Sequence, residues 1–129
     1  MKPLAILTLC LLIAGCGNDD DIDLSCMQSD WVGTYTGTRS CDGGAEVNVT
    51  VTISASGSQL MVSYVTGTTV VTPGEPIDFT GCQIDEDIVG QGANYSIKAT
   101  LDGNELELED RLVFGSAIGP LCQIRATKN

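Results

Sequence analysis

The sequence predicts an all-β protein, a small antiparallel meander barrel of about seven or eight strands, with a β-sandwich as the alternative. The clearest strand covers residues 45–54, where apolar and polar side chains alternate from Val47 to Ile53. The clearest hairpin joins an alternating segment that begins at Tyr95 to a second one around Leu106 and Leu108, across the turn signal Asp102-Gly103. No segment has a sustained helical period.

The other elements follow in order along the chain. Residues 31–39 are expected to form the first strand, residues 41–44 a turn, and residues 59–66 the third strand. Residues 67–76 are ambiguous because β-prone Thr and Val are interrupted by Gly and Pro, while residues 77–84 form a further strand candidate. Residues 85–87, 90–92 and 115–120 are predicted loops, and residues 121–127 the last strand. Residues 111–114 either extend the preceding strand or begin another one.

The N-terminal residues have the pattern of a sorting signal. Lys2 precedes an apolar run of about a dozen residues, which is shorter than a membrane span. The run ends in Ile13-Ala14-Gly15-Cys16, which resembles the lipobox of bacterial lipoproteins. The resemblance implies that residues 1–15 are a signal peptide, that Cys16 is acylated, and that the mature chain is anchored to a membrane by its N-terminus.

Residues 16–25 are expected to form an acidic tether in front of a domain that covers residues 26–129. The run Gly17-Asn18-Asp19-Asp20-Asp21 resembles the export signal of surface lipoproteins of Bacteroidota, which implies the outer membrane and the cell surface. Asp19, Asp21 and Asp23 have the spacing of a calcium loop, but Leu24 stands where the loop needs Gly, so we predict no metal site. The net charge of -11 excludes nucleic acid as a partner.

Four cysteines remain after the signal peptide and Cys16 are set aside: Cys26, Cys41, Cys82 and Cys122. An even number of cysteines in an exported protein predicts two disulfides, with three possible pairings. A zinc site is the competing interpretation, but the sequence has no His and no CxxC spacing.

A second resemblance concerns the fold. The segment Trp31-Val32-Gly33-Thr34-Tyr35-Thr36-Gly37, with Arg125 near the last strand, is similar to the lipocalin-like or calycin-like pattern. In that pattern a first-strand Trp closes one barrel end and a late Arg packs across it, which implies a structural pair of Trp31 and Arg125. If the strands alternate up and down without skipping, Cys41 pairs with Cys122 and Cys26 pairs with Cys82.

The residue types in the chain indicate a binding protein and not an enzyme. Without His, no Ser-His-Asp or Cys-His arrangement can form, and no cofactor motif is present. Two roles stay open: a displayed module that binds an unknown partner, either a protein or a glycan, or a carrier of a small apolar ligand. A carrier would have an internal cavity lined by inward-facing side chains, whereas in a solid barrel the same side chains would fill the core. These side chains are Val47, Val49, Val51, Ile53, Tyr95, Ile97, Leu106 and Leu108.

Overall fold

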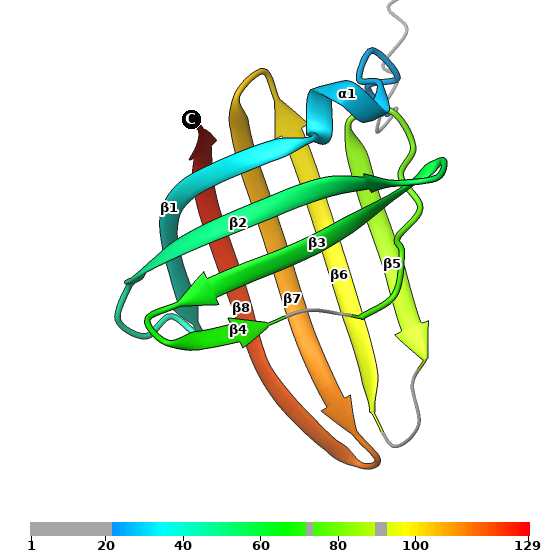
Figure 1. The fold of residues 1–129 in the computed structure, drawn as a ribbon. Helices are drawn as coiled ribbons and strands as arrows, with labels where there is room; N and C mark the ends of the chain where they lie inside the picture. Colours follow the sequence, from blue (N-terminus) through cyan, green and yellow to red (C-terminus); the bar gives the residue numbers. More distant parts are fainter. Residues whose placement is uncertain (1–21, 72–73, 90–92) are drawn as a thin grey trace, which may run out of the picture.

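The computed structural model describes residues 22–71, 74–89 and 93–129, and shows one antiparallel sheet of eight strands curled into a half-barrel (Figure 1). The all-β meander prediction is therefore confirmed. The strands are β1 (Gly33–Cys41), β2 (Val47–Ser56), β3 (Gln59–Thr66), β4 (Thr69–Val71), β5 (Gln83–Val89), β6 (Asn94–Asp102), β7 (Glu105–Phe114) and β8 (Ala117–Lys128). A helix of one turn, α1 (Gln28–Trp31), precedes β1.

The first and last strands of the meander pair with each other, and this pairing makes the curl. The strand order is β4-β3-β2-β1-β8-β7-β6-β5, so β1 joins the two halves of the sheet. Figure 1 shows β2 and β3 crossing in front of the layer formed by β5 to β8. The two ends of the sheet, β4 and β5, do not pair with each other in the described chain.

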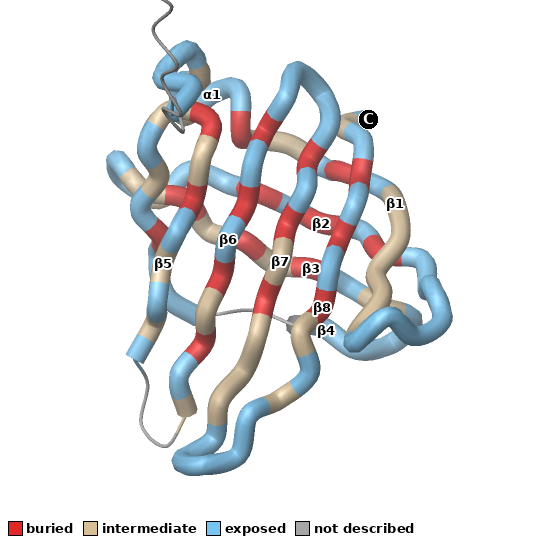
Figure 2. Tube along the Cα trace, turned by 180° about the vertical axis from the view of Figure 1, so that it is seen from behind, coloured by how far each residue is buried: buried red, intermediate tan, exposed pale blue. Residues whose placement is uncertain are grey.

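The strand alternation predicted from the sequence sets which side chains enter the space between the two layers. Buried and exposed residues alternate along β2, β6, β7 and β8 (Figure 2), and the buried ones form a single apolar core. The predicted hairpin at residues 102–105 is present, with Asp102 opposite Glu105 and Gly103 at a φ of 58°. A two-residue hairpin turn needs a positive φ at its first residue, and glycine adopts this conformation without strain.

Several boundaries differ from the sequence-based predictions. Trp31 ends α1 and does not lie on a strand. Residues 85–87, predicted as a loop, lie within β5, and residues 115–120 overlap the start of β8. The candidate strand at residues 77–84 is wrong, because Ile77 makes only an isolated bridge to Leu60 and β5 begins at Gln83. Phe114 ends β7, so residues 111–114 extend that strand.

Both predicted disulfides form with the predicted pairing, Cys26 with Cys82 and Cys41 with Cys122. Cys41 and Cys122 lie directly opposite each other on β1 and β8, at the end of β1 away from α1. The Cys26–Cys82 disulfide lies at the α1 end, because Cys26 comes just before α1. There the Cys82 amide also donates to the Asp23 carbonyl at 2.7 Å. The two crosslinks therefore hold opposite ends of the half-barrel.

Candidate functional site

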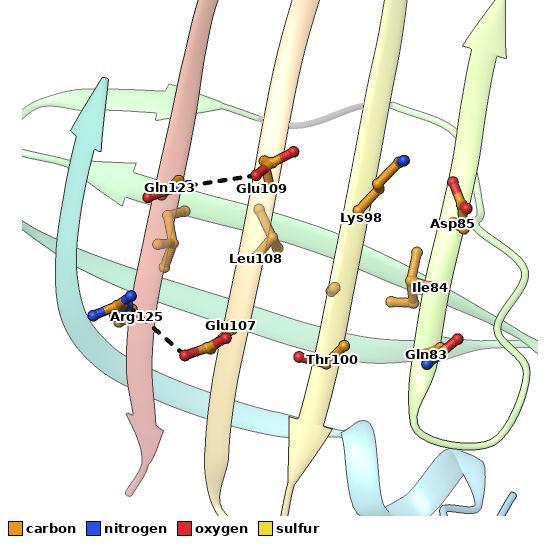
Figure 3. A pocket seen from close by; sticks show the side chains of 12 residues that line it. Gln83, Ile84, Asp85, Lys98, Thr100, Glu107, Leu108, Glu109, Gln123 and Arg125 are labelled. Atoms are coloured by element: carbon orange, nitrogen blue, oxygen red, sulfur yellow. Dashed lines mark hydrogen bonds and ion pairs between the residues drawn. The ribbon is translucent and has the colours of Figure 1, made fainter. Parts of the chain in front are cut away.

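A hollow lies on the side of β5 to β8 that faces away from the core, and we call this side the outer face. The hollow has a volume of about 330 Å³ and is open to solvent. Figure 3 shows the polar side chains that rise from the four neighbouring strands around it: Gln83, Asp85, Lys98, Thr100, Glu107, Glu109, Gln123 and Arg125. Since these residues alternate with Ile84, Leu108 and Ile124, the apolar side chains of the same strands point into the core.

The charges on the outer face are weakly paired. Arg125 Nε lies 3.8 Å from Glu107 Oε1, and Gln123 Nε2 donates to Glu109 Oε2 at 3.4 Å. Lys98 stands opposite both Asp85 and Glu109 in the strand register. Exposed pairs of this kind contribute little to stability, so their donors and acceptors remain open to exchange partners with a bound molecule.

The interior contains one buried charged group within the described residues, Asp110, which lies on β7 near the end away from α1. Tyr95 Oη donates to Asp110 Oδ2 at 2.7 Å, and Tyr64 Oη lies 2.6 Å from Tyr95 Oη. Arg39 lies over the Tyr64 ring, and its Nη2 is 3.6 Å from Asp110 Oδ1. We call these four residues the interior polar cluster.

Burial dominates the chemistry of this cluster. Desolvation raises the pKa of Asp110 to about 6, and the guanidinium of Arg39 offsets only part of that rise. Burial also raises the pKa of Tyr95 above its ordinary value. Asp110 Oδ1 and Arg39 Nε are buried and make no hydrogen bond with the described residues. The cluster thus joins β1, β3, β6 and β7 through polar groups whose hydrogen bonds are only partly satisfied.

The side chains that the sequence assigned to a possible ligand cavity meet in the core instead. All of them except Val47 belong to the single buried cluster. Val47 is wrong as an interior residue, because it is 50% exposed at the beginning of β2. Tyr95 joins the interior polar cluster rather than a cavity wall.

The expected pair of Trp31 and Arg125 is also wrong. Trp31 is fully buried and its Nε1 donates to the Gly81 carbonyl at 2.8 Å, whereas Arg125 lies exposed on the outer face beside Glu107. The basic residue at the Trp31 end is Lys128, whose Nζ lies over the Tyr35 ring and donates to the Asp30 carbonyl at 2.8 Å. Since alternate residues of a strand face opposite sides, the odd-numbered Arg125 cannot point inward beside Ile124 and Ala126.

Sequence reasoning missed Asp110 and Arg39, although a signal for the first exists. Asp110 continues the inward phase of Leu106 and Leu108, so it places a carboxyl where an apolar residue is expected.

Comparison of the chain with known protein families, with curated proteins and with solved structures found no match. The lipobox and Cys16 lie outside the described residues, as does the acidic run at residues 17–21. In residues 22–71, 74–89 and 93–129 we find no helix that has the length and apolarity to cross a membrane. The same ranges contain no group of three or more potential metal-binding side chains.

Proposed function

We propose that the protein is a lipid-anchored lipoprotein of the bacterial outer membrane that is exposed on the cell surface. Its disulfide-linked half-barrel binds a partner protein through the outer face of β5 to β8, and its role is binding, not catalysis. The lipobox and the acidic run support the address, and two crosslinks suit an exported domain.

The observation that carries this proposal is the distribution of filled and open space. Core side chains from both layers pack together between the layers, while the hollow of about 330 Å³ lies outside, on residues of four strands. An apolar ligand carrier needs a concave and mostly apolar site. The hollow of the outer face is lined by eight polar or charged side chains, and these can make hydrogen bonds and charge pairs with another protein.

The position of the N-terminal segment agrees with display of the domain. The described chain enters at the α1 end, and the β7–β8 hairpin lies at the opposite end of the half-barrel (Figure 1). A tether that enters at the α1 end leaves the outer face of β5 to β8 free to meet a partner.

Photo-crosslinking on whole cells tests the binding face. A photoreactive amino acid replaces Gln123, which lines the hollow, and in a matched variant it replaces Thr52, which is exposed on the other layer. We expect a discrete crosslinked protein from position 123 and none from position 52. Equal yields from the two positions, or no adduct at position 123, would contradict the assignment of the face.

Two further measurements test the anchor and the alternative role. Mass spectrometry of the mature protein should find an acylated Cys16, and Cys16→Ser should release the protein from the membrane fraction. Protease added to intact cells should cleave the wild-type protein if it is exposed on the surface. A stoichiometric apolar adduct in native mass spectrometry of the oxidised domain would instead support a ligand carrier.

A further inference from the structure

We propose that the free edge of β5 binds an extended, basic segment of the partner protein, which adds a strand to the sheet. This inference rests on the proposed function, because β5 forms one border of the outer face: Gln83 and Asp85 line its hollow.

The backbone of β5 identifies which groups are free. Cys82 accepts a hydrogen bond from the Leu101 amide on β6, whereas Gln83 exchanges both of its backbone bonds with Thr80, at 2.9 and 3.0 Å. In an antiparallel pair, successive residues direct their N–H and C=O groups to opposite edges. Asp85, Asp87 and Val89 therefore have the same phase as Gln83, and their backbone groups point away from β6.

Within the part of the chain that the structure describes, no backbone bond reaches those three residues from the free side. Thr80 covers only the beginning of the strand, at Gln83. The rest of β5 is regular, since each residue from Gln83 to Val89 has a partner on β6 without a bulge. A regular, unpaired edge is a template for another strand.

The side chains of β5 select the charge of the incoming strand. Asp85 and Asp87 are exposed and Glu86 is half-buried, and among the described residues none of the three forms an ion pair or a side-chain hydrogen bond. Lys98 stands opposite Asp85 in the register, yet no ion pair joins them. A Lys or Arg on the added strand would lie opposite each exposed carboxylate.

The same charges argue against a second copy of this chain as the occupant. Two β5 edges placed side by side would bring Asp85 and Asp87 of one chain against the carboxylates of the other, and like charges that face each other are destabilising. The net charge of -11 adds a general repulsion between copies. These charges therefore disfavour pairing of two β5 edges and favour the addition of a strand of opposite charge.

A short synthetic peptide of alternating lysine and valine is the probe. Paired antiparallel to β5, its lysines lie opposite Asp85 and Asp87, and its valines face the side of Ile84 and Ile88. The backbone groups of those lysines then point toward β5, and those of the valines point away. N-methylation of the lysine nitrogens should abolish binding, whereas N-methylation of the valine nitrogens should preserve it.

The binding is measured by NMR titration of the folded, oxidised domain, together with amide hydrogen exchange. We expect shifts along β5 and slowed exchange at the amides of Asp85, Asp87 and Val89. The double variant Asp85→Asn with Asp87→Asn should weaken binding about tenfold. Glu46→Gln with Asp102→Asn removes the same charge from exposed sites away from the free edge of β5 and should leave binding unchanged.

Three outcomes would overturn the inference: no binding, equal loss with both methylated peptides, or equal weakening by both double variants. The last would mean that any cation binds this acidic surface. Failure here is separable from failure of the proposed function. If position 123 still crosslinks a partner after Asp85 and Asp87 are changed to Asn, the outer face stands and only the strand-addition mode falls.

Discussion

The buried carboxyl of Asp110 should make the stability of the protein depend on pH in an unusual direction. Its pKa is about 6 in the folded chain, against an ordinary value of 3.8, so the folded state holds this proton more tightly than the unfolded state does. The stabilising contribution of the protonated group is complete below the unfolded pKa and is lost as the pH rises through about 6. The variant Asp110→Asn cannot ionise, but its side-chain carbonyl can still accept the hydrogen bond from Tyr95.

The magnitude follows from the size of the pKa shift. Each pKa unit corresponds to about 1.4 kcal/mol, so the full contribution is about 3 kcal/mol. At about pH 4 the unfolded carboxyl is already partly ionised, which reduces the contribution to about 2 kcal/mol. The free energy of unfolding of Asp110→Asn minus that of the wild type should therefore rise by about 2 kcal/mol between about pH 4 and about pH 7.5.

Urea unfolding of the oxidised domain across this pH range measures the difference. Other carboxylates titrate in both proteins, so their effects cancel in the comparison. Thr52→Ser, at an exposed position without an ionisable side chain, is the control and should differ from the wild type by an amount that does not change with pH. A difference for Asp110→Asn that is equally flat would refute the reasoning, as would an NMR titration that places the Asp110 pKa near 4.

Three other predictions concern the packing of β1 against β8 and the ends of the half-barrel. Gly37→Ala should destabilise the fold by about 2 kcal/mol or more in urea unfolding, because a Cβ at this position would meet the backbone of Arg125 on β8. Replacing Cys41 and Cys122 together by Ser should cost about 4 kcal/mol, since the crosslink closes a loop with a sequence separation of 81, and a loss under 1 kcal/mol would argue against this estimate. Lys128→Ala should lower the melting temperature more than Arg125→Ala, because only Lys128 packs on Tyr35 and caps a carbonyl of α1, and the reverse order would restore Arg125 as the structural cation.

Much of the fold was predictable because strand alternation is a local property. The alternation from Val47 to Ile53 and the hairpin at residues 102–105 identify strands and inward faces without knowledge of the partner strand. Alternation also predicts the ends at which cysteines lie in an up-and-down meander, and both disulfides follow from it.

Local patterns failed where a residue serves a partner far away in the chain. Residues 85–87 have the composition of a loop, yet they form the middle of β5 because β6 supplies the backbone partners. Trp31 looks like a strand residue, but its indole reaches Gly81, fifty residues further along the chain, from the end of a helical turn.

The sequence by itself determined the all-β class, the inward face of most strands and the number of crosslinks, since each depends on residue order and on cysteine count. Only the tertiary structure decided that β1 pairs with β8, that β5 has a free edge, and that Asp110 meets Tyr95 and Arg39 in the interior. Those features arise from the curl of the sheet, which brings together strands that no local pattern relates to one another.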